Sequence, residues 1–132
     1  MTKEALCAAA IAARQHAYAP YSGCLVGAAL LAADGSVYTG CNVENASYGA
    51  TLCAERTAFA KAISEGNRQF TMLAVAGSEG SEINGGFPPC GICRQVIAEF
   101  CEPDFTVLVV TAPDTYKEYT LSELLPAAFR LS

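Results

Sequence analysis

The apolar positions of this chain recur at helical spacing in some segments and form continuous runs in others. Helical spacing predicts a first helix over 2–17. Its apolar face is mostly alanine and consists of Leu6, Ala9, Ala10, Ala13 and Ala17. A continuous apolar run over 25–32 predicts a strand that is buried on both faces. Asp34-Gly35 then predicts a tight hairpin, because both residues tolerate positive φ, and 37–41 is expected to return as the second strand.

The middle of the chain adds two helices and one strand to this pattern. A polar segment, 42–50, leads into a second predicted helix over 53–64. We expect a third strand over 70–76 and then a loop over 77–88 that is rich in Gly, Ser and Pro. A third helix is expected to begin at or just after Cys90. Its buried stripe consists of Cys93, Val96, Ile97, Phe100 and Cys101.

The C-terminal part predicts two more strands and a short helix. The strands are expected over 105–111 and 116–119, and Thr120 and Glu123 form a capping box that starts the helix. Strands that alternate with helices after an opening hairpin predict an α/β fold, with a mixed sheet and helices on both faces. No internal repeat or linker interrupts the pattern, so we expect one domain over residues 1–132.

Composition and charge narrow the possible partners. Apolar residues make up 52% of the chain, yet no uninterrupted apolar run is long enough to cross a membrane, and we see no secretory signal. The net charge is −5 and no basic run occurs. A protein that binds polynucleotide phosphates needs a stripe of Lys and Arg, so a DNA or RNA editor is disfavoured. A free nucleoside carries no phosphate and is compatible with this charge.

Seven cysteines carry most of the chemical information. Four of them lie in apolar surroundings, as buried free thiols do: Cys7, Cys24, Cys41 and Cys101. Since nothing indicates export and disulfides are rare in reducing compartments, we expect a cytoplasmic protein. The other three, Cys53, Cys90 and Cys93, have the spacing of metal ligands.

Two short motifs place these three thiols beside a carboxylate. Cys53-Ala54-Glu55-Arg56 is followed by Pro89-Cys90-Gly91-Ile92-Cys93. A catalytic zinc takes three protein ligands and keeps a fourth position for water. Glu55 lies two residues from a ligand and is therefore a candidate general base. Cys-x-Glu followed by Pro-Cys-x-x-Cys resembles the signature of zinc-dependent nucleobase deaminases in its all-cysteine form.

The cysteines are compatible with two other kinds of site or module. A closed structural zinc site needs four ligands, but the first motif offers one cysteine, and the only histidine, His16, lies far upstream. A zinc-stabilised binding module without catalysis would not require Glu55. An open catalytic zinc site is the better hypothesis.

Arg56 is the second candidate for a role in catalysis. Three thiolates and Zn²⁺ sum to −1, a charge that should make a bound water less acidic. Arg56 lies three residues after Cys53 and is placed to donate hydrogen bonds to the ligand sulfurs and withdraw charge. The alternative is an ordinary salt bridge on the helix surface. Cys53 itself lies at a helix N-terminus, where the dipole favours a thiolate.

Six segments in the same order resemble the small homotetrameric cytidine deaminases over nearly the whole chain. The segments are Tyr-Ala-Pro-Tyr-Ser (18–22), Val-Gly-Ala-Ala-Leu (26–30), Gly-Cys-Asn-Val-Glu-Asn (40–45), Cys-Ala-Glu-Arg-Thr-Ala (53–58), Pro-Cys-Gly-Ile-Cys-Arg-Gln (89–95) and Leu-Leu-Pro-Ala-Ala-Phe (124–129). The resemblance implies the three-layer fold of that family, with a five-stranded sheet. It implies one Zn²⁺ per subunit and hydrolysis of cytidine and deoxycytidine to uridine and deoxyuridine with release of ammonia.

The resemblance also assigns substrate contacts and an assembly. It implies that Asn42 and Glu44 hold the ribose hydroxyl groups and that Ala54 lies against the substrate. It further implies a homotetramer with shared active sites. The residues that would reach into a neighbouring subunit's active site are Ala46, Tyr48 and Phe129. Glu55 would carry a proton from water to N3 of the base and a second proton to the departing amine.

Cys24 is a departure from the family, which usually has phenylalanine at this position. A smaller side chain widens the pocket wall, so one alternative is a deaminase or amidohydrolase that acts on N4-substituted cytosine nucleosides. The other possibility is that a neighbouring residue such as Phe87 or Phe129 fills the space. Both remain open from the sequence.

Overall fold

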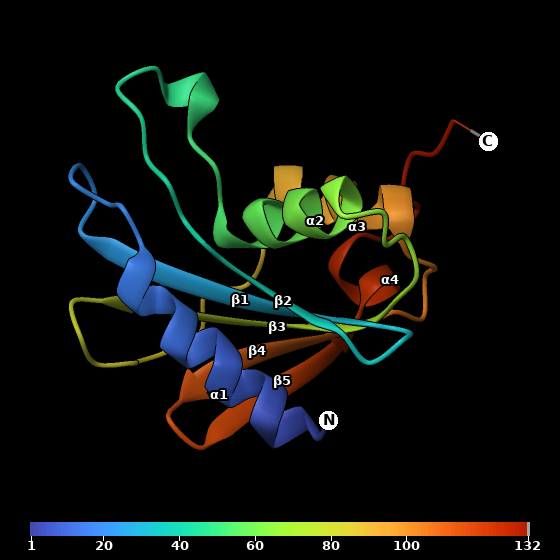
Figure 1. Ribbon diagram of the computed structural model, residues 1–132, viewed down its shortest axis with the longest axis horizontal. Coiled ribbons are helices and arrows are strands. Elements are labelled where there is room, and N and C mark those ends of the chain that lie inside the picture. Colours follow the sequence, from blue (N-terminus) through green and yellow to red (C-terminus); the bar gives the residue numbers. More distant parts are fainter. Residues whose placement is uncertain (132) are drawn as a thin grey trace.

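A computed structural model describes residues 1–131 as a sheet between two layers of helices (Figure 1). The strands are β1 (Cys24–Ala32), β2 (Val37–Cys41), β3 (Phe70–Glu79), β4 (Thr106–Ala112) and β5 (Thr115–Thr120). The α-helices are α1 (Lys3–Ala13), α2 (Ala54–Ser64), α3 (Gly91–Phe100) and α4 (Leu121–Leu124). Two 3₁₀ turns, η1 (Arg14–His16) and η2 (Tyr48–Ala50), complete the elements.

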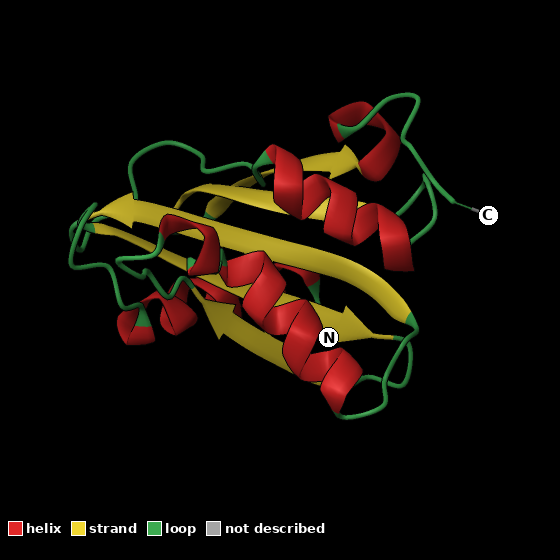
Figure 2. Ribbon diagram, turned by 90° about the horizontal axis from the view of Figure 1, so that it is seen from above, coloured by secondary structure: helices red, strands yellow, loops and turns green. Residues whose placement is uncertain are grey.

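The sheet has the order β2-β1-β3-β4-β5. β3 and β4 pair in parallel and the other neighbours pair antiparallel, so the sheet is mixed. Seen from above in Figure 2, the strands are twisted relative to one another, as expected for a sheet that packs against helices. The predicted α/β class with a mixed five-stranded sheet is confirmed.

Helices cover both faces of the sheet. α1 lies on one face, and α2, α3 and α4 lie on the other (Figure 1). Alternate residues of β1 serve the two layers: Leu30 packs with the α2 and α3 side chains, whereas Ala29 packs with α1. The continuous apolar run in β1 is therefore explained by burial on both sides. No helix among the described residues is long and apolar enough to span a bilayer.

A glycine in β2 sets the height of α2 above the sheet. A Cβ added at Gly40 would lie 2.5 Å from the carbonyl oxygen of Ala54 and 2.6 Å from the amide nitrogen of Ala58. The first turns of α2 therefore rest directly on the backbone of β2. This contact fixes the position of Cys53, the residue at the N-cap of α2.

Two predicted N-terminal elements differ from the observed ones. The first helix ends at Ala13 rather than near Ala17, since η1 follows it and the amide of Tyr18 then donates to the carbonyl of Asn42 (2.9 Å). The hairpin between β1 and β2 is present, but only Gly35 has positive φ, because the connection is longer than two residues. Asp34 serves this turn with its carboxylate, which accepts a hydrogen bond from the amide of Ser36 (2.9 Å).

The third strand was predicted too short. β3 runs to Glu79 because its last residues pair with the start of β1, where Cys24 faces Glu79 and Val26 faces Gly77. The predicted fourth and fifth strands are shifted or lengthened by about one residue at their ends. The capping box at α4 is confirmed: the Thr120 hydroxyl accepts from the amide of Glu123, and the Glu123 carboxylate accepts from the amide of Thr120.

Candidate metal centre and active site

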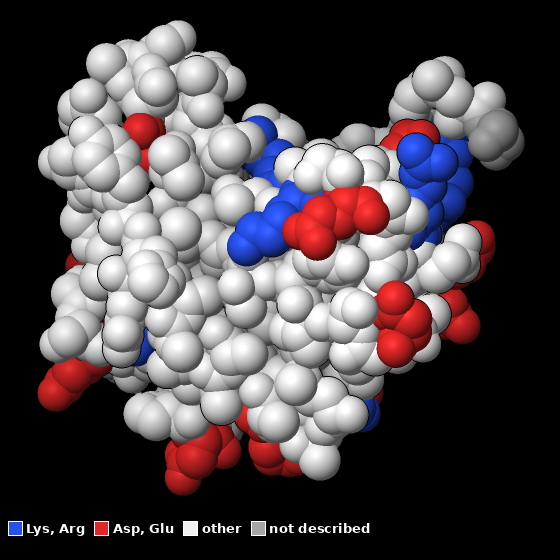
Figure 3. Space-filling view, viewed as in Figure 1, with Lys and Arg blue, Asp and Glu red and all other residues white. Residues whose placement is uncertain are grey.

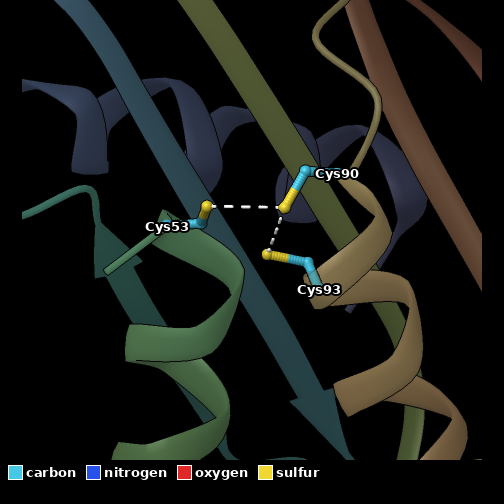
Figure 4. Close-up of side chains that lie close together, drawn as sticks. All are labelled: Cys53, Cys90 and Cys93. Carbon is cyan, nitrogen blue, oxygen red and sulfur yellow. Dashed lines mark hydrogen bonds between the residues drawn. The ribbon is translucent and has the colours of Figure 1, made fainter. Parts of the chain in front are cut away.

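Three cysteine side chains meet where two helices begin on the same face of the sheet. Cys53 is the N-cap of α2, Cys90 is the N-cap of α3, and Cys93 lies in the first turn of α3. Their sulfur atoms point toward one another (Figure 4). The Sγ atom of Cys90 lies 3.7 Å from that of Cys53 and 3.5 Å from that of Cys93, and all three lie within 4.8 Å of one another.

These distances fit a tetrahedral zinc site. With Zn–S bonds of about 2.3 Å, tetrahedral geometry requires sulfur atoms about 3.8 Å apart. The two separations that involve Cys90, 3.7 and 3.5 Å, are close to this value. Three soft thiolate donors are also the ligand type that zinc prefers. The three cysteines can therefore hold a zinc ion and leave a fourth position open.

The thiols of this cluster differ in their acidity. Hydrogen bonds from Cys93 and Arg56 lower the pKa of Cys53 to about 5, so Cys53 carries the negative charge. The same interaction with Cys53, together with burial, raises the pKa of Cys93. Both helix N-termini direct their amide groups toward this region, which favours negative charge there. The negative charge that is favoured at Cys53 favours the binding of a cation by the cluster.

Arg56 contacts the sulfur of Cys53 from one helical turn away. Its Nη2 atom donates to the Sγ atom of Cys53 (3.3 Å) and to the carbonyl oxygen of Thr51 (3.2 Å). The guanidinium is thus held between the loop before α2 and the sulfur. The contact with Cys53 favours the role proposed from the sequence over a simple surface salt bridge.

Glu55 is a buried carboxyl group beside the thiols. Its side chain is only 4% exposed and lines the same cavity as Cys53 and Cys90. Burial raises the pKa of Glu55 to about 7. A carboxyl group with a pKa near neutrality can both accept and release a proton at physiological pH, as general acid–base catalysis requires. Glu55 therefore lies where a proton shuttle is needed.

The cavity has a volume of about 270 Å³ and extends from the thiols to the loop before β1. Ala54, which is fully buried, forms part of its floor. Cys24 lines the cavity, as expected, together with Asn42 and Glu44. The structure therefore brings Cys53, Cys90, Glu55 and four of the predicted substrate residues to one cavity. The third predicted ligand, Cys93, is fully buried and joins the cluster through its sulfur, 3.5 Å from that of Cys90.

Asn42 and Glu44 hold the cavity wall as well as facing into it. The Oδ1 atom of Asn42 accepts from the amide of Val26 (2.9 Å), and its Nδ2 atom donates to the carbonyl of Cys24 (2.8 Å). The Glu44 carboxylate accepts from the hydroxyl and amide of Ser22 and from the amide of Tyr21. These bonds, led by that from the Ser22 hydroxyl, lower the pKa of Glu44. Glu44 is thus an ionised acceptor at the cavity mouth.

Three predicted substrate residues do not line this cavity. Tyr48 is 83% exposed, Phe129 is 67% exposed, and Ala46 is also exposed. Figure 3 shows a hollow above α2 and α3, flanked by the raised segment that contains η2 and by the C-terminal segment. Within one subunit these three residues lie outside the lining of the cavity that contains Cys53 and Cys90.

Several other cavity residues were not singled out as substrate contacts in the sequence. They include Ser22, Val26, Thr51, Leu52, Phe87 and Pro88. Alternation along the first strand would have placed Val26 on the same face as Cys24, and Phe87 was considered only as a possible filler. No sequence signal indicated Thr51 or Leu52, because their approach depends on the path of an irregular loop.

Comparison with known proteins agrees with this geometry. Residues 1–109 match the family described as the cytidine and deoxycytidylate deaminase zinc-binding region. The cytidine deaminase of Sporosarcina psychrophila is 50% identical over 129 residues, which are 98% of this chain and 92% of the relative. The cytidine deaminase of Halalkalibacterium halodurans is 51% identical over 129 residues, covering 98% and 95% of the two chains. The crystal structure of cytidine deaminase from Burkholderia pseudomallei is 48% identical, with a TM-score of 0.89 and coverage of 98% and 100%.

Proposed function

The chain belongs to the cytidine and deoxycytidylate deaminase zinc-binding family, and on that premise we propose that it is a zinc-dependent cytidine deaminase. The reaction consumes cytidine or deoxycytidine and water and yields uridine or deoxyuridine and ammonia. One observation carries the proposal: three thiols converge, and two of them, Cys53 and Cys90, share a cavity with the buried carboxyl group of Glu55.

The chain's own residues divide the chemistry among them. Cys53, Cys90 and Cys93 would hold the zinc, which when bound would act as a Lewis acid and lower the pKa of water. Glu55 accepts a proton from the attacking water and delivers it to N3 of the base. Its pKa near 7 lets it take up a second proton and pass it to the departing amine. Arg56 withdraws charge from Cys53 through its 3.3 Å hydrogen bond.

The cavity mouth provides the sugar site. Glu44 is ionised and keeps acceptor capacity beyond its bonds to Tyr21 and Ser22, so it can accept hydrogen bonds from ribose hydroxyl groups. Asn42 is fixed beside it by the start of β1 and presents the rest of its amide to the sugar. Ala54 packs against the base near Glu55.

We further propose a homotetramer whose active sites are completed by neighbouring subunits. Tyr48 and Phe129 are large, exposed aromatic residues that a second copy of the chain would cover. Such exposed aromatic groups mark interaction surfaces. Ala46 lies in the same raised segment as Tyr48 and would approach the neighbour's cavity with it.

The domain and the compartment follow from the same proposal. Residues 1–132 would act as one catalytic domain, because the helices that carry the thiols and the sheet beneath them form one core cluster. All seven cysteines are free thiols, which accords with a reducing cytoplasm.

The test is a panel of cytosine nucleosides with zinc-loaded protein. Cytidine, deoxycytidine and N4-methylcytidine would be incubated separately, with uridine or deoxyuridine and ammonia or methylamine measured as products. We expect rapid, stoichiometric conversion of the first two nucleosides. A metal-replete protein that releases no ammonia from either one would overturn the proposal.

A further inference from the structure

Phe87 lines the apolar side of the cavity from the loop between β3 and α3. Among the described residues that line this cavity it is the single aromatic residue. Cys24 also lines this cavity, from the start of β1, and supplies no ring. Within one subunit, the aromatic contact for a flat pyrimidine base would therefore come from Phe87.

Gly77 provides the seat for this ring. A Cβ added at Gly77 would lie 2.3 Å from Cγ and 2.7 Å from both Cβ and Cδ1 of Phe87. Real Cβ atoms do not approach other heavy atoms so closely. The clash involves the root of the side chain rather than a flexible end, so the ring cannot swing aside without moving its backbone. Phe87 thus rests directly on the backbone of β3, and only glycine permits this contact.

The register of the sheet places Cys24 beside the same seat. Val26 faces Gly77 in the antiparallel ladder, and Cys24 lies two residues before Val26. Side chains two residues apart in a strand point to the same face. Cys24 is therefore the diagonal neighbour of Gly77, within reach of an aromatic side chain that stands on it. The small side chain of Cys24 and the absence of a side chain at Gly77 leave space for one ring. The ring of Phe87 occupies this space.

We propose that Phe87 sets which bases the cavity accepts, and that Gly77 and Cys24 create the space that its ring needs. The inference rests on the proposed function, since it takes the ligand to be a pyrimidine nucleoside. Phe87 supplies the flat apolar contact for the base, and Gly77 is a positioning residue that acts only through Phe87. The aromatic side of the cavity thus comes, within one subunit, from the loop between β3 and α3.

The experiment compares matched variants in zinc-loaded form. It measures kcat and KM for cytidine and the inhibition constant of uridine, which reports binding without turnover. Phe87→Val should raise both KM and the inhibition constant about tenfold, because base–aromatic contacts contribute this much or more to binding. kcat should change less than threefold, as expected when an interaction common to the bound states is lost. Phe100→Val, which removes a ring that stacks on Phe59 in the core, is the control and should leave both constants unchanged.

Two double variants test the seat itself. Gly77→Ala should raise the two constants as much as Phe87→Val does, and the combined variant should be no worse than Phe87→Val alone, because both changes remove one contact. Cys24→Phe should be as harmful by itself, and Cys24→Phe with Phe87→Val should recover most of the loss. If Gly77→Ala does not fold, recovery of folding in the double variant with Phe87→Val supports the same contact.

The contrary results are equally distinct. If KM for cytidine and the inhibition constant of uridine stay within twofold of wild type in Phe87→Val and Gly77→Ala, the inference is overturned. The proposed function would not be affected, because the wild type would still turn over cytidine. The shared space would be overturned if Gly77→Ala combined with Phe87→Val were worse than Phe87→Val alone. It would also be overturned if Phe87→Val failed to rescue Cys24→Phe. Absence of cytidine turnover by the wild type would instead overturn the proposed function, and this inference would fall with it.

Discussion

The guanidinium of Arg56 and the sulfur of Cys53 lie one helical turn apart on α2 and are joined by a hydrogen bond of 3.3 Å. The same Nη2 atom also donates a hydrogen bond to the carbonyl oxygen of Thr51. The Arg56 side chain is therefore held by Cys53 and by the loop residue Thr51. A cation thereby stands beside a site whose three thiolates would carry more negative charge than one Zn²⁺ neutralises. The three-residue spacing at the start of α2 places the positive charge of Arg56 beside Cys53 and so offsets part of the negative charge of the thiolates.

Removal of this compensation should slow catalysis without emptying the site. We expect Arg56→Gln to retain zinc and to lower kcat about tenfold or more, because substitution of groups that support metal ligands typically costs 10–100-fold in affinity or activity. Arg56→Lys should recover part of the activity, since it keeps the charge but not the planar donor geometry. Zinc content and kcat measured on the same samples test this. Full activity in Arg56→Gln would show that the contact is only structural.

Glu55→Gln should separate proton transfer from metal binding. The amide has almost the same shape but cannot accept the water proton, so turnover should fall by about 10²–10⁴-fold, the range of general acid–base catalysis. Zinc content should equal that of the wild type, because Glu55 is not one of the three clustered thiols. Metal analysis and ammonia release are the measurements. Turnover within tenfold of wild type in the metal-replete variant would contradict the proton-shuttle role.

Cys90→Ala should disconnect the starts of α2 and α3. Its sulfur lies within 3.7 Å of both other thiols, so its loss removes a ligand and the bridge between two helices. We expect loss of zinc, loss of activity and a lower melting temperature, because metal binding free energy contributes to folding. Cys41→Ala is the matched control, as this thiol lies outside the cluster. A zinc-loaded and active Cys90→Ala variant would mean that the ligand set is wrong.

Gly40→Ala tests whether the height of α2 above β2 controls the metal site. The new Cβ would lie 2.5 Å from the carbonyl oxygen of Ala54, so the start of α2 must move. We expect a loss of about 1–3 kcal/mol in the free energy of unfolding, as for overpacked cores, together with weaker zinc binding. Gly49→Ala is the control, because an added Cβ there meets nothing within 4 Å. Zinc affinity equal to wild type in Gly40→Ala would show that the site tolerates movement of the helix.

The metal site was predictable from the sequence, whereas only part of the cavity wall was. Cys53, Glu55, Cys90 and Cys93 belong to two compact motifs whose chemistry fixes the residue types and whose positions at helix starts follow from local signals. The elements themselves were found because apolar periodicity is a local property. The end of β3 was missed because pairing with β1, a distant segment, determines it.

The contact between Phe87 and Gly77 shows why distant contacts cannot be predicted from local sequence patterns. Gly77 was assigned to a loop, and its lack of a side chain matters only because a ring ten residues later folds back onto it. Nothing in the spacing of these residues indicates that contact, since the loop between them has no regular period. The positions of Tyr48 and Phe129 present a related problem. Their exposure in one subunit is a property of the surface, and their proposed role depends on a second copy of the chain.

That role can be tested by subunit exchange. Phe129→Ala should have low activity if its ring completes a neighbour's cavity, and Glu55→Gln should be inactive in its own cavity. In a mixed tetramer, a Glu55→Gln subunit can lend its intact Phe129 to a cavity that holds an intact Glu55, so activity should rise well above that of either protein alone. Exchange would be followed with differently tagged subunits, and sedimentation would report the oligomer.

A mixture of Glu55→Gln with Cys90→Ala is the control, because each of its cavities lacks either the carboxylate or a metal ligand, neither of which a neighbour supplies. Mixed tetramers without any gain would show that each subunit builds its own active site, and a monomer at working concentration would overturn the proposed assembly.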